Sequence, residues 1–307
     1  MEPVGAFGDQ GGSAPLDPPL VRDAPDPRYS SSEKKAGCNT DVATSRMRPA
    51  FSSDKVMGSG ASGPSGVQGQ SPWPPGAPCI AAIIPVLNEA GAIGPTLRRL
   101  PRDIIGTAIV VDGGSTDGTQ TEARDAGAIL IEESRRGYGR ACQTGADHAA
   151  AIGADIVIFM DGDGADAVEQ VATLLAPLLA GAADFVLADR TGPFRDPGSM
   201  GPHQILAGRL VGAAVGLITG VRYRDMCAFR ALRLTDLHRL GMKDMGYGWN
   251  LEMQIRAARA GLRVLEVPLP YHCRTAGRSK VAGSFSGTFR AGQRIAKTLV
   301  RVGLQAR

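Results

Sequence analysis

Between residues 80 and 188, short apolar runs alternate with segments that we predict as helices, and this alternation limits the possible folds more than any other feature. The apolar runs lie at Ile80–Ile84, Thr107–Val111, Ala128–Glu132, Asp155–Met160 and Phe185–Ala188. The predicted helices lie at Asn88–Leu100, Thr119–Ala126, Gly139–Ala151 and Ala167–Leu179. Strands and helices that alternate at this spacing form right-handed βαβ units. We therefore predict an α/β fold with a mostly parallel central sheet.

The segment before this alternation has a different composition. Pro, Gly and Ser make up 34 of the first 78 residues, and no apolar period is sustained there. Such a segment cannot bury enough apolar surface to offset the entropy of the chain. We therefore predict a disordered arm at residues 1–78, followed by one folded domain at residues 79–283.

The formal net charge of +4 is unevenly distributed. From Arg274 to the C-terminus there are eight basic residues and no acidic residue. A protein that binds duplex nucleic acid usually spreads its basic charge over the folded domain. With only 5% aromatic residues, the chain also has few side chains on which bases could stack. We expect no nucleic-acid partner.

The basic tail has helical spacing. Within residues 284–307, one face of a helix would carry Arg290, Arg294, Lys297 and Arg301. This pattern is typical of an amphipathic helix on an anionic membrane surface, or of a helix that docks its apolar face on the domain. A second apolar stretch, Ile205–Ile218, contains Arg209 and is too short to span a bilayer. It predicts a buried or interfacial helix.

Polar residues follow four of the predicted strands. They are Asn88 and Glu89, Asp112, Asp161 and Asp163, and Asp189 and Arg190. In parallel sheets the carboxyl ends of the strands meet at one edge, and ligands bind there. The pattern predicts a cleft, although turns favour Asp, Gly and Ser without any ligand.

The most informative of these positions is Asp161-Gly-Asp163. Two carboxylates at a strand end make a small oxygen site that suits Mg²⁺ or Mn²⁺ shared with a diphosphate. A calcium loop does not fit, because the sixth position is Asp166 instead of Gly and the twelfth is Ala172 instead of Glu. A dinucleotide-binding fingerprint is also missing after the first strand.

Three motifs resemble the signatures of family 2 glycosyltransferases with the GT-A fold: Ile83-Ile-Pro-Val-Leu-Asn-Glu89, Val110-Val-Asp-Gly-Gly-Ser-Thr-Asp-Gly-Thr119 and Asp161-Gly-Asp163. Three later motifs resemble the dolichyl-phosphate mannose or glucose synthase branch: Ala188-Asp-Arg190, Asp225-Met-Cys-Ala-Phe-Arg230 and Arg274-Thr-Ala-Gly-Arg-Ser-Lys280. The resemblance covers about Ile80 to Gly283, in the family's order. It implies a GT-A type nucleotide-diphospho-sugar transferase.

The resemblance also implies residue roles on the donor side. Pro85, Asn88 and Glu89 would line the nucleotide pocket, and Asp112 would contact the base. Asp161 would contact the ribose or the metal. Asp163 would be the main ligand of Mg²⁺ or Mn²⁺ and hold it against the diphosphate.

On the acceptor side, the resemblance implies that basic residues bring two anions together. Arg190 and Arg230 would face the acceptor phosphate. Arg274, Ser279 and Lys280 would belong to a mobile loop that closes over the phosphates. Basic side chains suit this task, because the departing nucleoside diphosphate gains negative charge in the transition state.

The chain departs from this family pattern at the metal site. Ala165 stands where synthases of this branch have a metal-binding Gln. The shell would then be completed by Asp166, by water or by His272. The alternative for His272 is an ordinary polar residue at a strand end.

The need for a general base depends on the acceptor. A hydroxyl acceptor needs a base within hydrogen-bond reach, whereas a phosphate oxygen is already anionic. Glu252 is our candidate base and Asp225 the second choice. The alternative for Glu252 is an exposed i,i+4 ion pair with Arg256.

Together these features predict an inverting, metal-dependent hexosyltransferase on the inner, cytoplasmic face of a membrane. It would move a sugar from a nucleotide-diphospho-sugar to a polyprenyl phosphate. The alternatives are a soluble acceptor such as a phosphoglycerate, or a protein that binds nucleotide sugars without turnover.

Overall fold

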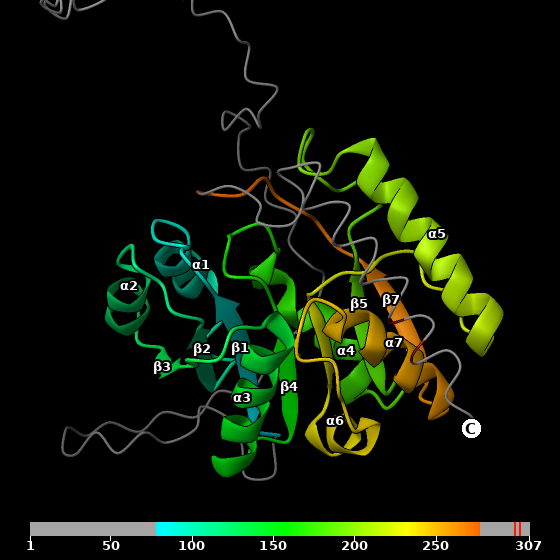
Figure 1. Ribbon diagram of the computed structural model, residues 1–307, viewed down its shortest axis with the longest axis horizontal. Helices are drawn as coiled ribbons and strands as arrows, with labels where there is room; N and C mark the ends of the chain where they lie inside the picture. The colour runs from blue at the N-terminus through cyan, green and yellow to red at the C-terminus, as the bar shows by residue number, and fades with distance from the viewer. Residues whose placement is uncertain (1–77, 277–297, 299–300, 302–307) are drawn as a thin grey trace, which may run out of the picture. The chain divides into compact units, whose positions relative to one another are not determined.

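The computed structural model describes residues 78–276, 298 and 301 (Figure 1). Its strands are β1 Ile80–Val86, β2 Thr107–Asp112, β3 Ile129–Glu132, β4 Ile156–Phe159, β5 Phe185–Asp189, β6 Arg230–Arg233 and β7 Val264–Pro268. Its helices are α1 Ile93–Arg99, α2 Thr119–Asp125, α3 Tyr138–Ala151, α4 Val171–Leu179, α5 Pro202–Thr219, α6 Leu234–Leu240 and α7 Trp249–Arg259, with a 3₁₀ turn at Val168–Gln170 before α4. Except for Pro78, Thr298 and Arg301, the predicted arm at 1–78 and the predicted helix at 284–307 lie outside the described residues.

The described strands form one seven-stranded sheet in the order β3-β2-β1-β4-β6-β5-β7. All pairs are parallel except those of β6, which runs antiparallel to β4 and to β5. The predicted α/β fold with a mostly parallel sheet is confirmed. The sequence pattern did not predict β6 or β7, because both are short and lie outside the regular alternation.

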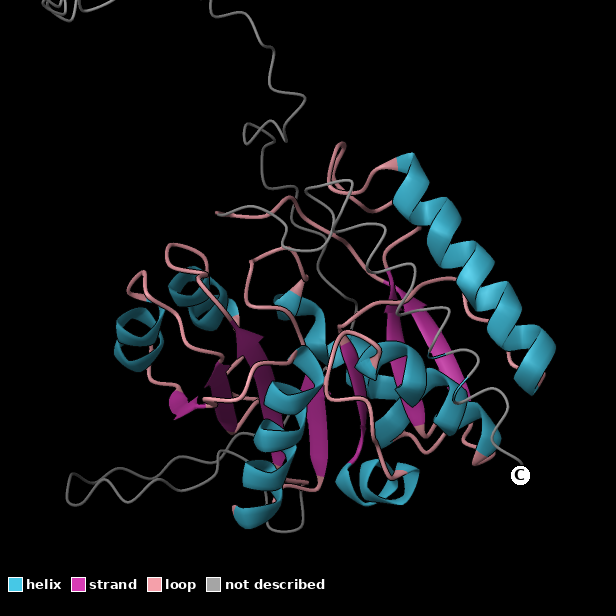
Figure 2. Ribbon diagram, in the orientation of Figure 1, coloured by secondary structure: helices cyan, strands magenta, loops and turns pink. Residues whose placement is uncertain are grey.

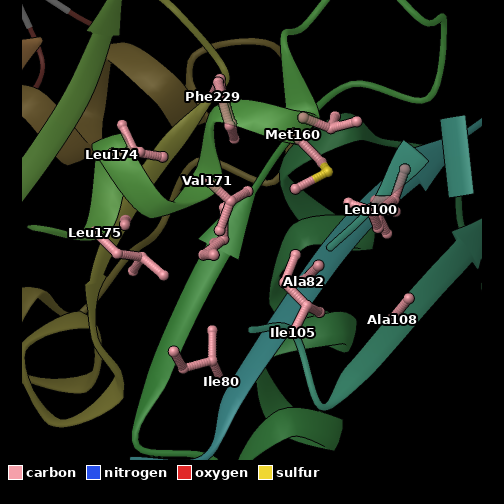
Figure 3. Packing of buried hydrophobic residues seen from close by; sticks show 14 of the residues in the cluster. Ile80, Ala82, Leu100, Ile105, Ala108, Met160, Val171, Leu174, Leu175 and Phe229 are labelled. Atoms are coloured by element: carbon pink, nitrogen blue, oxygen red, sulfur yellow. The ribbon is translucent and has the colours of Figure 1, made fainter. Parts of the chain in front are cut away.

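Helices cover both faces of the sheet (Figure 2). One buried cluster packs α1, α2 and α4 on one face, and it includes Leu97, Ala123 and Leu174 (Figure 3). The other cluster packs α3, α6 and α7 on the opposite face, and it includes Cys142 and Trp249. The result is a three-layer α/β/α arrangement with β1 and β4 in its centre.

Strand β1 explains why an apolar run marks the middle of the sheet. Ile80, Ala82 and Ile84 join the first cluster, while Ala81 and Ile83 join the second. Since successive side chains of a strand point to opposite faces, a strand that is buried on both sides must be apolar throughout. Figure 3 shows Ile80 and Ala82 on the same side of this strand.

The first predicted helix begins later than its sequence pattern indicates. Instead of starting at Asn88, α1 starts at Ile93, and the intervening residues form a loop. Asn88 has a φ of 50°, in the left-handed region that Asn tolerates better than most residues. This shift places Asn88 and Glu89 in the loop that follows β1.

Helix α5 contains the predicted helix at Ile205–Ile218. Only Gly212 and Val215 are buried among its residues. A Cβ atom at Gly212 would collide with the carbonyl oxygen of Tyr223, so glycine permits the close contact of α5 with the following loop. Among the described residues, no helix combines the length and the apolar character needed to cross a membrane.

Candidate active site

The polar residues that follow the strands lie along the carboxyl edge of the sheet. This edge carries Asn88, Glu89, Asp112, Asp161, Asp163, Asp189 and Arg190. Pro85 lies in β1 beyond Ile83, the last β1 residue that pairs with β4. Its missing N–H is tolerated there, since β1 has separated from β4. The expected juxtaposition of these residues at one edge is therefore present.

The loops after β1 and β2 are hydrogen-bonded into one unit. The backbone N–H of Asn88 donates to Ser115 Oγ at 2.8 Å, and that of Thr116 donates to Asn88 Oδ1 at 2.8 Å. The N–H of Glu89 donates to Thr119 Oγ1 at 2.8 Å. These bonds fix the position of both predicted donor-side residues relative to β2.

Asp112 organises the loop that follows β2. Its carboxylate is buried and accepts hydrogen bonds from the N–H groups of Gly114 at 3.2 Å and Ser115 at 3.0 Å, and from Gln120 Nε2 at 2.7 Å. The Ser115 hydroxyl also donates to it. Asp112 therefore shapes the loop, while its contact with a nucleotide base stays a prediction.

Three carboxylates crowd together after β4. Asp166 Oδ2 accepts the N–H of Asp161 at 2.9 Å, and Asp163 Oδ1 accepts the N–H of Ala165 at 2.9 Å. Burial raises the pKa of Asp161, and the charge of Asp163 raises it further. Burial likewise raises the pKa of Asp166, and the charges of Asp161 and Asp163 raise it further. The cluster concentrates negative charge, and a bound cation would offset it.

Arg274 faces this cluster from the segment after β7. Its guanidinium lies 2.7 Å from Asp163 Oδ2 and 3.9 Å from Glu89 Oε1. The first contact is an ion pair to a buried carboxylate oxygen that accepts no further hydrogen bond from the described residues. The N–H of Thr275 donates to the carbonyl of Asp163 at 3.0 Å. The segment that carries Arg274 thus lies directly on the acidic cluster.

The acidic cluster fits a divalent ion that is shared with a ligand. Among the residues that the structure describes, no three His, Cys, Asp or Glu side chains are arranged as a protein-only metal site. Mg²⁺ and Mn²⁺ sites often use one or two carboxylates, and substrate phosphates and water complete the shell. The crowded carboxylates and the buried Asp163 Oδ2 suit that arrangement.

Arg190 is held by Asp225 in a bidentate ion pair. Arg190 Nε lies 2.7 Å from Asp225 Oδ2, and its terminal nitrogen lies 2.9 Å from Oδ1. The guanidinium also stacks 4.8 Å from the ring centre of Tyr271. Burial alone would raise the pKa of Asp225, but the charge and hydrogen bonds of Arg190 lower it. An ionised, paired Asp225 is poorly suited to act as a general base.

Arg230 differs from its predicted role. It was expected to face the acceptor phosphate, but its side chain is fully buried in β6. Its terminal nitrogens donate to the carbonyl oxygens of Asn250, at 3.1 Å, and Cys227. This burial does not support the predicted contact with the acceptor phosphate, because the guanidinium is covered and already bonded to two carbonyl oxygens.

The N–H of His272 donates to the carbonyl oxygen of Ala165 at 2.8 Å, and its ring contacts two carboxylates outside the acidic cluster. Its Nε2 lies 3.2 Å from Glu169 Oε1, and its Nδ1 lies 3.3 Å from Asp196 Oδ2. The hydrogen bond with Glu169 raises the pKa of His272 and outweighs the opposing effect of burial. Both ring nitrogens contact carboxylates in this arrangement and would have to leave them to bind a metal, so the metal-ligand role of His272 stays a prediction.

Glu252 forms the predicted i,i+4 pair with Arg256, but the pair is buried instead of exposed. Glu252 Oε1 accepts from Arg256 Nε at 2.8 Å, and Oε2 accepts the N–H groups of Lys243 at 3.0 Å and Asp244 at 2.5 Å. The carboxylate is fully buried. It fixes the loop before α7, and this geometry does not support a role as general base.

Two of the predicted loop residues, Ser279 and Lys280, lie outside the described residues. Sequence reasoning did not select Tyr271 or Glu169. Tyr271 lies next to His272, three residues before the basic motif that begins at Arg274. Glu169 contacts His272, which lies 103 positions later in the sequence, and no local sequence pattern predicts such a contact.

Comparison with known proteins agrees with this architecture. Residues 81–237 match the family model described as glycosyl transferase family 2. The chain is 33% identical to glycosyltransferase AglJ of Haloferax volcanii over 205 residues, which are 66% of this chain and 65% of AglJ. The match with AglJ thus spans slightly less than two thirds of that protein.

Two further relatives carry more specific names. Undecaprenyl-phosphate mannosyltransferase of Micrococcus luteus is 31% identical over 68% of this chain and 89% of the relative. Dolichyl-phosphate hexose transferase of Haloferax volcanii is 32% identical over 74% of this chain and 95% of the relative.

Among solved structures, the fold resembles glucosyl-3-phosphoglycerate synthase from Mycobacterium tuberculosis in complex with Mn²⁺ and UDP-glucose. The TM-score is 0.57, with 23% identity over 73% of this chain and 79% of that chain. At this identity the likeness concerns the fold, which is the GT-A type. The matched family model, the relatives and the acidic edge of the sheet lead to one conclusion: this chain belongs to glycosyl transferase family 2 and is a glycosyltransferase.

Proposed function

We propose that this protein is an inverting, metal-dependent hexosyltransferase that moves a sugar from a nucleotide diphosphate to a polyprenyl phosphate at a membrane surface. The observation that carries the proposal is the acidic cluster of Asp161, Asp163 and Asp166 with Arg274 and Arg190 beside it. Carboxylates for a metal and cations for two phosphate groups then meet at one edge of the sheet. The names of the two polyprenyl-phosphate relatives support the choice of acceptor.

On the donor side, the rigid loops after β1 and β2 would hold the nucleotide. Pro85, Asn88 and Glu89 would line its pocket, and Asp112 would contact the base or hold the loop that does. Because the hydrogen bonds between the loops are already formed, little conformational entropy would be lost when the nucleotide binds.

Asp161 and Asp163 would hold Mg²⁺ or Mn²⁺ together with oxygens of the diphosphate. When bound, the ion would offset the charge of the leaving nucleoside diphosphate. Arg274 now contacts Asp163 and is on the correct side to move onto a phosphate. Ser279 and Lys280 would join it in the proposed closing loop.

The acceptor assignment rests on which acids are available. Glu252 is buried and bonded to Arg256, and Asp225 is bonded to Arg190. Neither candidate is placed as a free base, so an acceptor that is already anionic fits better than a hydroxyl. Arg190, whose side chain is 15% exposed, would orient that phosphate.

Helix α5 supports the membrane part of the proposal. It exposes Leu206 (59%), Leu210 (63%) and Leu217 (91%). The sequence from Pro197 to Arg224 contains no acidic residue. An apolar, non-acidic helix of this kind is suited to the headgroup region of an anionic membrane, and we propose that the basic segment 284–307 joins it on the cytoplasmic face.

A transfer assay tests these assignments separately. Purified protein would be given nucleotide sugars with Mn²⁺ or EDTA, and with undecaprenyl phosphate in vesicles or with 3-phosphoglycerate in solution. We expect sugar transfer only to the lipid and only with the metal. Transfer to 3-phosphoglycerate would replace the acceptor assignment, and donor binding without any turnover would replace the enzymatic one.

A further inference from the structure

Residues 271–275, which include Arg274, lie between two loops at the carboxyl edge of the sheet. Tyr271 forms isolated β-bridges with Asp166, in the loop after β4, and with Arg195, in the loop after β5. This segment therefore joins the loop that carries the acidic cluster to the loop that precedes α5.

On the side of the acidic cluster, the hydrogen bonds to this segment come from the backbone. The N–H of His272 donates to the carbonyl of Ala165 at 2.8 Å, and the N–H of Thr275 donates to the carbonyl of Asp163 at 3.0 Å. Between these two bonds, Arg274 places its guanidinium 2.7 Å from Asp163 Oδ2. The position of Arg274 over the carboxylates thus depends on how the backbone of residues 271–275 is held.

On the other side, one aspartate contacts each of the three residues that precede Arg274. The N–H of Asp196 donates to the carbonyl of Tyr271 at 2.8 Å. Its Oδ2 accepts the N–H of Cys273 at 3.2 Å and lies 3.3 Å from Nδ1 of His272. Asp196 therefore holds the segment through its backbone and through its side chain.

His272 extends this link to a third part of the fold. While its Nδ1 faces Asp196, its Nε2 lies 3.2 Å from Glu169 Oε1, in the 3₁₀ turn before α4. Glu169 in turn lies 3.8 Å from the guanidinium of Arg99, the last residue of α1. The ring is thus held between carboxylates of two different loops, and this restricts the backbone next to Arg274.

A contribution to stability alone is a poor explanation for the Asp196 contacts. The side chain of Asp196 is 45% exposed, and exposed charged contacts contribute little to stability. The position of a phosphate-binding guanidinium matters much more, since a misplacement of about 1 Å can reduce a rate about 100-fold. The main consequence of these contacts is therefore the placement of Arg274.

We propose that Asp196 is a positioning residue that holds Arg274 within reach of the donor diphosphate. It acts through the N–H of Cys273 and the ring of His272. The inference rests on the proposed function, because Arg274 must serve the diphosphate for its placement to matter. A preorganised arginine loses less conformational freedom when the ligand binds, and this raises the affinity.

The test is a double-mutant cycle on the full-length chain with Mn²⁺. Asp196→Ala, Arg274→Ala and the double variant are compared with the parent by calorimetry, with UDP, GDP and dTDP as ligands. Asp196→Asn is added because it keeps an oxygen that can accept the N–H of Cys273, and it replaces Asp196→Ala in the cycle if that variant does not fold. Asp236→Ala is the matched control, since Asp236 forms its ion pair within α6, with Arg239.

We expect Arg274→Ala to bind the preferred diphosphate about 10–100-fold more weakly, and Asp196→Ala about 3–10-fold more weakly. In the Arg274→Ala background, the further loss from Asp196→Ala should be less than about twofold, because Asp196 acts through Arg274. Asp196→Asn should lie between Asp196→Ala and the parent, and the control should bind as the parent does.

An equal loss from Asp196→Ala in both backgrounds would overturn the inference, because a merely structural role does not depend on Arg274. An unchanged or higher affinity of Asp196→Ala would overturn it as well, as would an Arg274→Ala variant that binds as tightly as the parent. These outcomes leave the proposed donor site at the acidic cluster intact. A parent that binds none of the three diphosphates with Mn²⁺ would overturn both.

Discussion

The two halves of the sheet are built in different ways. Strands β3, β2, β1 and β4 are parallel and come from consecutive βα units, whereas β6, β5 and β7 include an antiparallel strand and long connections. The first half carries the acids proposed for the donor, and the second carries Arg190 with Asp225. The halves also differ in the sequence distance that their polar contacts bridge.

In the first half, the loops that follow β1 and β2 bond to each other. The contacts of Asn88 with Ser115 and of Glu89 with Thr119 span 27 and 30 positions. In the second half, Arg224 reaches Glu266 across 42 positions, and His272 reaches Asp196 across 76. We infer that contacts between neighbouring βα units fix the donor loops of the first half, whereas the acceptor side depends on charge pairs such as that of Arg190 with Asp225, which spans 35 positions.

The largest expected effect belongs to the first half. In Asp163→Asn, we expect transfer to fall by roughly 10³-fold or more, because the proposed main ligand of the ion is lost. The free energy of unfolding should change by no more than about 1 kcal/mol, since the loss of the ion pair with Arg274 is offset by weaker repulsion among the carboxylates. Transfer rates and denaturant unfolding measure the two quantities.

Asp147→Asn is the control for this change, because Asp147 is an exposed residue of α3. It should leave transfer unchanged. If Asp163→Asn retained the parent's rate with Mn²⁺, the acidic cluster would not be the metal site. The proposal that the first half of the sheet holds the donor diphosphate would then fail.

The second prediction concerns the long-range pair in the other half. Asp225→Asn leaves Arg190 without its bidentate partner in a mostly buried position. We expect the free energy of unfolding to fall by about 3 kcal/mol, together with a loss of transfer. Chemical denaturation provides the measurement.

The pair of Asp236 with Arg239, in which the arginine is exposed and the carboxylate is mostly covered, supplies the comparison for that variant. Asp236→Asn should cost less than about 0.5 kcal/mol, since the arginine is 68% exposed and surface pairs contribute little. An equal loss of unfolding free energy in the two variants would mean that the ion pair of Arg190 with Asp225 stabilises the fold no more than the pair of Asp236 with Arg239.

The sequence predicted the first half well because its signals are local. Apolar runs, turn residues and the spacing of Asp161 and Asp163 all lie within single βα units, and each strand end could be read directly. Strands β6 and β7 were missed because each follows a region without regular alternation. Neither is a continuous apolar run, since β6 reads Arg-Ala-Leu-Arg and β7 contains Glu266, so each becomes a strand only by pairing with β4 or β5.

The predicted residue roles that this geometry does not support share one cause. Arg230, His272 and Glu252 are chemically capable of the predicted tasks, but other groups of the folded chain already occupy their polar atoms. Motif position gives the type of a side chain and its place in the chain. It does not give the partners, which come from tertiary packing.

The third prediction tests the apolar surface of α5. Leu206→Gln with Leu210→Gln should weaken binding to anionic vesicles by about 2 kcal/mol, or roughly 30-fold, because two exposed leucines no longer enter the interface. Stability should stay within about 1 kcal/mol. Vesicle sedimentation measures the binding.

Leu179→Gln on α4 is the matched control, since Leu179 is 50% exposed on a helix of the other face. It should bind vesicles as the parent does. If both proteins lost affinity equally, or neither did, α5 would not be the membrane-facing element of the second half.

The smallest expected effect is a sensitivity to acid that the two halves share. A hydrogen bond from Arg263 lowers the pKa of Asp184, before β5, to about 2, and a hydrogen bond from Arg135 lowers that of Glu133, after β3, to about 2. Since both values lie below those of the unfolded chain, each pair stabilises the fold above about pH 4. That contribution is lost as the pH falls towards 2. Because the arginines are 57% and 67% exposed, we expect only about 1 kcal/mol from each.

Asp184→Asn and Glu133→Gln should therefore each be less stable than the parent at pH 7, and the difference should vanish near pH 2. Denaturant unfolding at several pH values measures it. A difference that persisted at pH 2 would mean that the carboxylate acts through packing instead of charge. Asp184 and Arg263 are 79 positions apart in the sequence, whereas Glu133 and Arg135 are two apart. A much larger loss of stability for Asp184→Asn than for Glu133→Gln would therefore mean that exposed long-range pairs also stabilise the second half.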